Sequence, residues 1–175
     1  MIFTSESGLL DASRIEEWDE WYRFHLAAMA AVPGIASAQR FRALDEGPPP
    51  SLAMYTVASP AVFDSEIYLR TRGMGPFVSL VDERLHRRNL FDGLDAAPNV
   101  PVTATLLVAD RSSPEGGDLI WLRAVGLDRS TAFRGLAVEA DAAAARRLAA
   151  SLGGPAALYR PMMPVIVAGD TERRR

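Results

Sequence analysis

His25 is the side chain of this sequence with the widest chemical range, because an imidazole titrates near neutral pH and can act as an acid, a base or a metal ligand. It follows Trp18 by seven positions. On a helix with about 3.6 residues per turn this spacing points both side chains in nearly the same direction, so His25 is expected to face the sheet within an apolar layer. Two interpretations stay open: a catalytic or ligand-binding histidine, and a neutral core histidine bonded to a backbone carbonyl, to Tyr55 or to a glutamate.

Guanidinium groups mark one face of the strand expected at 35–44. Every second residue of a strand points to the same face. Arg40 and Arg42 therefore share a face with Ala36 and Ala38. A buried arginine needs a carboxylate, which either a bound ligand or an internal Asp or Glu supplies. The structural alternative is a solvated or interface salt bridge. Tyr55, on the neighbouring strand, carries a phenol that either donates to a ligand oxygen or packs in the core or an interface.

A second basic cluster lies near the end of the first half of the chain. A strand over 84–91 places Arg84, His86 and Arg88 on one face. We expect this face to be solvated or to meet another subunit, because no aromatic platform accompanies it for stacking nucleic-acid bases. His25 and His86 are too far apart in the sequence to predict a zinc or non-haem iron site.

The composition excludes several kinds of chemistry. The chain of 175 residues has no cysteine, and all 19 of its Lys and Arg side chains are arginine. Disulfides, thiolate nucleophiles, cysteine-bound metals, Schiff bases and a Walker A lysine are therefore excluded. The net charge of -3 argues against a nucleic-acid partner. No apolar run is long enough for a membrane span and no signal peptide is visible, so we expect a cytoplasmic globular protein.

Capping signals and periodicity predict six elements in residues 1–95. In chain order they are a strand at 1–7, a helix from Ser13 to Pro33, strands at 35–44 and 51–58, a helix from Ser59 to Gly73, and a strand at 84–91. This β-α-β-β-α-β order is that of the ferredoxin-like unit.

Residues 101–170, beyond a Pro-rich linker, repeat this order in a degenerate form. The expected elements are a strand at 103–109, an amphipathic helical segment at 118–128, a strand at 133–139, a helix at 142–152 capped by Asp141, and a strand at 156–167 that two prolines confine to an edge or divide. This half is one strand short of the first. We therefore predict an α+β fold that is a tandem pair of related units, 1–95 and 101–170, the second degenerate.

The residues around His25 resemble a known family. The run WDEWYRFHL at 18–26 is followed by VPGI at 32–35 and by AQRFR at 38–42. This pattern resembles proteins of the dimeric α/β-barrel superfamily, and within it the EthD-like and related uncharacterised branch. The resemblance implies a ferredoxin-like dimeric α/β-barrel, completed either in a homodimer or between the two halves of one chain as an intramolecular pseudo-dimer. The superfamily includes polyketide cyclases, lactone isomerases, small monooxygenases and haem proteins, so the resemblance implies the fold far more strongly than the reaction.

The expected function is that of a cofactor-independent enzyme or binding protein for an apolar or aromatic metabolite, in the manner of a cyclase, an isomerase or a monooxygenase. The pocket is expected between the first sheet and its helices, with His25 as general acid or base and no metal. The expected binding residues are Trp18, Tyr22, Arg40, Phe41, Met54 and Tyr55.

Two alternatives stay open. One is a non-catalytic association module, in which the tryptophans and arginines form an interface. The other is a haem protein with His25 as the iron ligand. A pocket that is open beside His25 favours an enzyme, whereas a position closed by packed side chains favours an association module.

Overall fold

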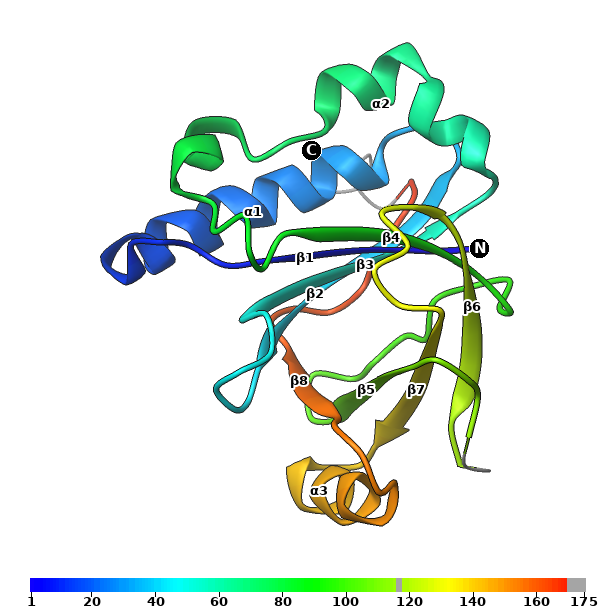
Figure 1. The fold of residues 1–175 in the computed structure, drawn as a ribbon. Helices are drawn as coiled ribbons and strands as arrows, with labels where there is room; N and C mark the ends of the chain where they lie inside the picture. The colour runs from blue at the N-terminus through cyan, green and yellow to red at the C-terminus, as the bar shows by residue number, and fades with distance from the viewer. Residues whose placement is uncertain (116–117, 170–175) are drawn as a thin grey trace.

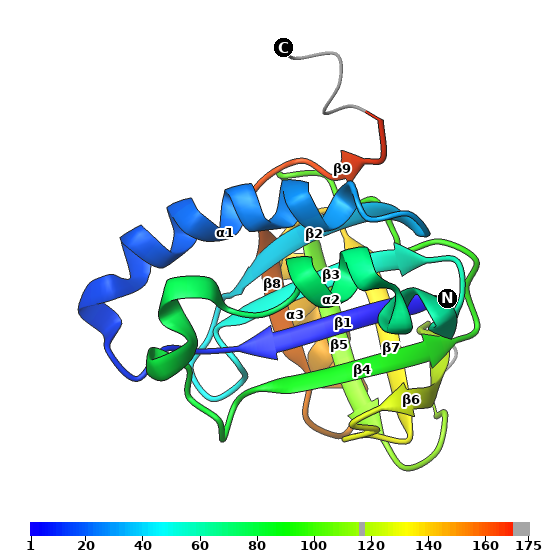
Figure 2. The same ribbon diagram turned by 90° about the horizontal axis from the view of Figure 1, so that it is seen from above.

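The first half of the chain forms a four-stranded antiparallel sheet with helices on one face (Figure 1). The structure is a computed structural model that describes residues 1–115 and 118–169. The strands lie in the order β2-β3-β1-β4. Their bounds are Ile2–Ser7 for β1, Ile35–Ala43 for β2, Ser51–Val57 for β3 and Arg87–Asp92 for β4. Helices α1 (Ile15–Ala30) and α2 (Glu66–Thr71) lie on the same side of this sheet (Figure 2).

Helix α1 is the long element that covers the sheet. The side chain of Asp11 accepts a hydrogen bond from the backbone N–H of Ser13 and caps a 3-10 turn that leads into the helix, so the cap lies two residues before the predicted one. The buried side chains of α1 recur at helical spacing and include Trp18, Tyr22 and Leu26. Beyond the helix, Gly34 has a φ of +89° and starts the turn into β2.

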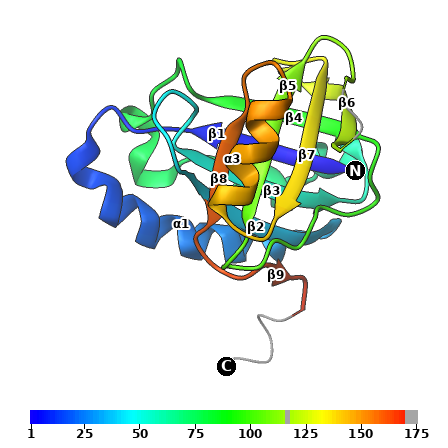
Figure 3. The ribbon, with the colours of Figure 1, turned by 90° about the horizontal axis from the view of Figure 1, so that it is seen from below.

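The second half forms another antiparallel sheet, with α3 on its outer face (Figure 3). The strands β5, β6, β7 and β8 lie in the order β6-β7-β5-β8. The bounds in this half are Thr105–Arg111 for β5, Ile120–Leu127 for β6, Phe133–Glu139 for β7, Ala142–Ser151 for α3, Ala157–Pro161 for β8 and Ile166–Val167 for β9. Within the described residues, no helix is long and apolar enough to cross a membrane.

The prediction of a helical segment at 118–128 is wrong, because this segment forms strand β6. In the second half, β5 to β8 therefore have the same relative order as β1 to β4 in the first, and the described residues between β5 and β6 form no helix. The last strand is divided at its prolines, as one of the two expectations had it. The division into units 1–95 and 101–170 stays a prediction, and residue 170 lies outside the described residues.

The two sheets join into one barrel within the chain. β4 pairs with β6, and β2 pairs with both β3 and β8, so the strands form the ring β1-β4-β6-β7-β5-β8-β2-β3. Such closure removes the free strand edges that an open sheet exposes. A second copy of the chain is therefore not needed to complete the barrel, and self-association stays a prediction.

The barrel interior combines an apolar core with one buried cationic side chain. Arg134 on β7 is fully buried, and its guanidinium contacts Glu6 at 2.6 Å and Asp110 at 2.7 Å. It also donates to the hydroxyl of Thr4 at 3.1 Å and lies over the ring of Phe91. Burial alone would lower the pKa of Arg134, but hydrogen bonding to Asp110 and the charge of Glu6 outweigh burial and raise it. The guanidinium thus joins β1 of the first half to β5 and β7 of the second.

Arg134→Met is expected to lower the free energy of unfolding by about 3–5 kcal/mol, because it leaves the buried Glu6 carboxylate without its cation. Urea denaturation measures this loss. Arg146→Met is the matched control, since Arg146 is also paired with a carboxylate, that of Asp45, but both side chains are about half exposed, 52% and 50%. The control is expected to cost less than about 1 kcal/mol. Equal effects of the two substitutions would contradict a structural role for the interior charge cluster.

Candidate functional site

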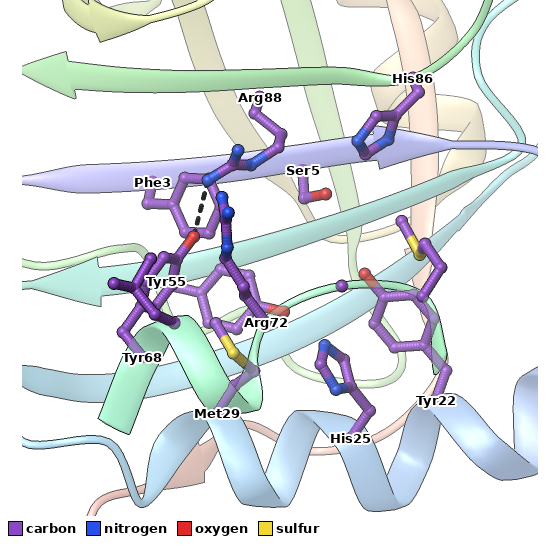
Figure 4. Close-up of a pocket in the computed structure, with 13 residues that line it drawn as sticks. Phe3, Ser5, Tyr22, His25, Met29, Tyr55, Tyr68, Arg72, His86 and Arg88 are labelled. Atoms are coloured by element: carbon purple, nitrogen blue, oxygen red, sulfur yellow. Dashed lines mark hydrogen bonds between the residues drawn. The ribbon is translucent and has the colours of Figure 1, made fainter. Parts of the chain in front are cut away.

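A cavity of about 300 Å³ lies between α1, α2 and the outer face of the first sheet. This volume is at the lower end of the range for small-molecule sites. Its lining is contributed by β1, α1, β3, α2 and the segment from 72 to 88. The lining residues are Phe3, Ser5, Tyr22, His25, Met29, Tyr55, Tyr68, Leu69, Arg72, Gly73, Met74, His86 and Arg88 (Figure 4).

Short side chains on the sheet leave room for this cavity. Strand register places Arg40, Ala53, Ser5 and Arg88 in one row across the sheet. Residues at such register positions point to the same face. The two residues in the middle of the row are short, whereas the arginines at its ends are long. The space above Ala53 and Ser5 therefore opens toward the helices.

His25 faces the cavity from α1 with its ring held against aromatic side chains. It stacks on Trp21 at a centroid distance of 4.7 Å and an interplanar angle of 11°, and it meets the edge of Tyr22 at 5.6 Å. Burial lowers the pKa of His25 to about 4. The imidazole is therefore neutral at pH 7, so it is a proton acceptor and not a cation. The side chain remains partly exposed and lines the cavity, which is the arrangement expected of an open pocket.

The backbone of Gly75 packs closely against the indole of Trp21, on the side away from His25. Gly75 has a φ of +48°, and a Cβ atom at this position would lie 2.8 Å from Cζ2 of Trp21. Only glycine allows both the left-handed backbone and the contact. The indole is thereby confined between the turn at Gly75 and the ring of His25.

Two tyrosines supply hydroxyl groups to the same cavity. Burial raises the pKa of Tyr22, and burial together with the neighbouring Tyr22 raises the pKa of Tyr55 well above its ordinary value. Both phenols therefore keep their protons over the whole physiological range. The two hydroxyls are hydrogen-bonded to each other, and that of Tyr22 also to Ser5. They therefore donate to a ligand oxygen that acquires negative charge as one linked pair and not as two independent donors.

His86 and Arg88 approach from the sheet side of the cavity. Nδ1 of His86 donates to the backbone carbonyl of Glu6 at 3.2 Å, since a carbonyl can only accept. In the neutral ring this leaves Nε2 as an acceptor. Arg88 donates to the hydroxyl of Tyr68 at 2.7 Å and lies over the ring of Phe3.

Other predicted site residues lie elsewhere. Trp18 and Arg40 line a separate cavity near the β2–β3 connection. Arg40 lies 4.1 Å from the ring centroid of Tyr22 and 2.9 Å from the carboxylate of Asp19, with Ser51 as a further partner. An internal carboxylate therefore meets Arg40, which was one of the two expectations for it. The carboxylate of Asp19 on α1 is held by both Arg40 and Arg42.

The prediction that Phe41 and Met54 line the pocket is wrong. Both are buried in the barrel interior with residues of the second half. They occupy strand positions that alternate with Arg40 and Tyr55, so their side chains point to the opposite face of the sheet from the helices. Of the predicted residues, the structure brings His25, Tyr22 and Tyr55 together.

Metal and haem fit these residues poorly. Among the described residues, no group of three or more His, Asp or Glu side chains is arranged to hold a metal ion. The cavity of about 300 Å³ is small for a four-pyrrole macrocycle, and the ring of His25 lies flat against Trp21. The chemistry of this cavity is therefore derived from its own side chains and not from haem.

Sequence reasoning missed the contribution of β4. Arg84, His86 and Arg88 were expected on one face of a strand at a solvated or subunit-facing edge, but β4 begins only at Arg87, and Arg84 lies in the turn before it, bound to Asp82. Arg88 shares a strand face with Leu90, which packs in the core beneath the helices, and His86 directly precedes the strand and lines the same cavity. Positions 86, 88 and 90 are spaced by two residues, as are side chains on one face of an extended chain. The apolar Leu90 is the signal that assigns this face to the side of the sheet that the helices cover. Tyr68 and Arg72 carry no comparable signal, because the position of α2 over the sheet is a tertiary property.

Comparisons with known proteins identify the fold. No family model matches the chain, and no curated protein matches it in sequence. A solved structure described as a candidate chlorite dismutase superposes with a TM-score of 0.57 at 15% identity, over 97% of this chain and 96% of that one. A candidate monooxygenase from Fusobacterium nucleatum subsp. nucleatum superposes with a TM-score of 0.55 at 9% identity, over 96% of this chain and 94% of that one.

Both neighbours belong to the dimeric α/β-barrel superfamily, and this chain shares their fold. The predicted α+β class is therefore confirmed. At these identities the likeness shows the fold alone. The narrower EthD-like assignment stays a prediction.

Imidazole NMR is expected to show His25 titrating near pH 4. Between about pH 6.5 and 4 the folded protein then binds fewer protons than the unfolded chain, so the free energy of unfolding falls as the pH drops through this window, by up to about 3 kcal/mol. His25→Gln is expected to remove this part of the pH dependence, and His86→Gln is expected to leave the titration of His25 in place. A midpoint for His25 near 6.5 would refute the effect of burial.

Gly75→Ala is expected to displace Trp21 and to shift the ring signals of His25, because the new methyl group meets the indole. The loss of stability is expected to be about 1 kcal/mol or more. Gly153→Ala is the matched control: Gly153 has a φ of +64°, but a Cβ atom at this position would meet no heavy atom of the surrounding structure within 4 Å. The control carries the backbone strain without the contact, so it should leave the His25 signals in place. Unchanged signals in both variants would contradict the role of Gly75 in confining Trp21.

Proposed function

We propose that the cavity beneath α1 and α2 binds a small apolar or aromatic metabolite and that His25 exchanges a proton with it. The observation that carries this proposal is the position of His25, which lines an open cavity as a neutral base surrounded by aromatic rings. A concave pocket in which convergent polar groups stand among apolar side chains is the common form of a small-molecule site. The superfamily membership of the structural neighbours is consistent with an enzyme.

The reaction class that this arrangement favours is a redox-neutral proton transfer. A proton leaves a carbon or oxygen of the ligand for a ring nitrogen of His25, and the charge left on a ligand oxygen is stabilised by the hydroxyls of Tyr22 and Tyr55. Return of the proton to another ligand atom completes an isomerisation or a cyclisation. Such a step balances without a cofactor or an oxidant.

The association module is the alternative from another class. It requires His25 to be closed off by packed side chains, whereas the ring is partly exposed at a cavity. Exposed apolar side chains nearby, such as Phe24 at 65% and Val78 at 71%, are the observation that favours it. Self-association through this surface is compatible with a ligand site beneath it.

A thermal-shift screen of aromatic acids, lactones and phenols is expected to find ligands that raise the melting temperature in proportion to affinity. The same ligands are expected to shift the imidazole NMR signals of both histidines. Because His25 and His86 are the two histidines of the whole sequence and both line the cavity, these signals report on the cavity directly. Incubation in D₂O then tests proton transfer: the wild-type protein should catalyse deuterium exchange into a bound ligand, and His25→Gln should lose it.

Arg23→Gln is the control, because Arg23 is exposed on the same helix and does not line the cavity. It should retain both binding and exchange. Ligand binding that leaves the histidine signals unmoved would place the site elsewhere and refute the proposal. Binding at the cavity without any exchange would reduce the proposal to a binding protein, and a concentration-dependent dimer with no ligand would favour the association module.

A further inference from the structure

The cavity beneath α1 and α2 carries two guanidinium groups that have no ion-pair partner among the described residues. Two of its lining residues are Arg72 and Arg88, and none of the lining residues is Asp or Glu. Across the described parts of the chain, no ion pair involves the guanidinium of either arginine. Two like charges at one cavity repel each other unless an anion lies between them.

Buried arginines elsewhere in the structure do have carboxylates. Arg134 contacts Glu6 and Asp110, and Arg40 contacts Asp19. The fold therefore supplies acids to guanidinium groups that it removes from water, as the cost of burying a charge requires. At Arg88, which is partly buried, the partner on the protein is instead a neutral phenol.

The contact between Arg88 and Tyr68 leaves donors for a ligand. The Tyr68 hydroxyl accepts from Nη2 of Arg88 at 2.7 Å, so its own hydrogen is directed at another acceptor. Arg88 has further N–H groups, and Arg72 adds a second guanidinium at the exposed rim. A carboxylate has two oxygens that accept from such a set of donors, and charge-assisted bonds of this kind are the strong ones.

Figure 4 shows polar groups along the whole cavity, with Ser5, Tyr55 and His25 between its two ends. The linked pair Tyr68 and Arg88 lies toward one end, while His86 and Tyr22 lie toward the other. Apolar side chains complete the lining, namely Phe3, Met29, Leu69 and Met74. A ligand that spans the cavity therefore meets cations at one end, a mixture of apolar and polar side chains along its length and the imidazole of His86 at the other end.

We propose that the cavity takes a small aromatic or apolar monocarboxylate, whose carboxylate is bound by Arg88, Arg72 and the Tyr68 hydroxyl. This inference rests on the proposed function of the cavity and adds the charge of the ligand and the residues that select it. The bound carboxylate places the rest of the ligand near His25 and His86. The selectivity comes from charge and not from shape, because an isosteric neutral amide cannot offset the two cations.

The test compares 1-naphthoate with 1-naphthamide, which differ in charge and little in shape, by calorimetric titration alongside the imidazole NMR signals. The wild-type protein is expected to bind the naphthoate at least about 10-fold more tightly. Arg88→Gln should weaken naphthoate binding by about 10-fold or more, and Arg72→Gln by about 3-fold because Arg72 is exposed. Neither substitution should change naphthamide binding by more than about 2-fold.

Matched arginines serve as controls. Arg87 adjoins Arg88 on β4 but lines a different cavity at the barrel mouth, and Arg70 on α2 is exposed and paired with Glu66. Arg87→Gln and Arg70→Gln should leave the preference for naphthoate intact. Arg88→Lys, which keeps the charge, should retain most of the preference even if Arg88→Gln disturbs folding.

The outcomes separate this inference from the proposed function. If both probes bind equally and shift the histidine signals, or if Arg88→Gln and Arg72→Gln leave the preference unchanged, the carboxylate inference is overturned while the cavity remains a ligand site. If neither probe binds and the histidine signals do not move, the proposed function fails and the inference fails with it. A preference for naphthoate that disappears in Arg88→Gln and persists in Arg87→Gln supports both.

Discussion

The buried guanidinium of Arg134 constrains the rest of this structure, because it requires carboxylates from strands that are distant in the sequence. Glu6 lies on β1 and Asp110 on β5, so the cluster forms only when the two sheets face each other around the barrel interior. Apolar residues pack around the cluster, and a cavity of about 390 Å³ lined by Glu6, Asp110 and Arg87 remains at the mouth of the barrel. The cavity that both histidines line is on the other face of the first sheet, under the helices.

The two halves of the barrel use their outer faces differently. In the first half, α1 and α2 cover the sheet with large aromatic residues and leave a cavity between them. In the second half, the alanine-rich α3 packs closely on β5, β7 and β8, with Ala145 fully buried. Small side chains bring a helix near the sheet, whereas aromatic side chains hold it further away. Both histidines of the chain belong to the first half, so the titratable chemistry and the cavity coincide there.

The sequence predicted the first half well because each element carries its own local signal. A helical apolar stripe and alternating strands agree with one another there, and the direction of the His25 side chain followed from its spacing to Trp18. The capping predictions for this half were wrong: Asp11 and Ser65 cap in place of Ser13 and Ser59, and the helix expected from Ser59 to Gly73 is a 3-10 turn at Pro60–Asp64 followed by α2. The segment 118–128 was misassigned because both faces of β6 carry apolar side chains. Leu122 and Ala124 face the barrel, while Trp121 packs outside it. With two apolar faces the period of two is obscured, and a helical spacing fits equally well.

Strand order was the second limit on prediction. Phe41 and Met54 were assigned to the pocket because their alternation with Arg40 and Tyr55 indicates two faces, but not which face the helices cover. His86 and Arg88 line the cavity because β4 pairs with β1. The sequence of neither strand alone predicts which strand it pairs with. The resemblance supplied the barrel, but only the register identifies the row of residues that forms the cavity floor.

Strand β1 connects the structural and the chemical parts of the molecule through its alternation. Ser5 points to the cavity, whereas Glu6 points into the barrel and binds Arg134. The backbone carbonyl of Glu6 also accepts from Nδ1 of His86, so the tautomer of that histidine is set by the main chain and not by a side chain. On one face of β1, Glu6 thus helps to neutralise the buried cation of Arg134 inside the barrel. On the other face, the guanidinium of Arg88 from the neighbouring strand β4 lines the cavity and has a neutral phenol, that of Tyr68, as its hydrogen-bond partner.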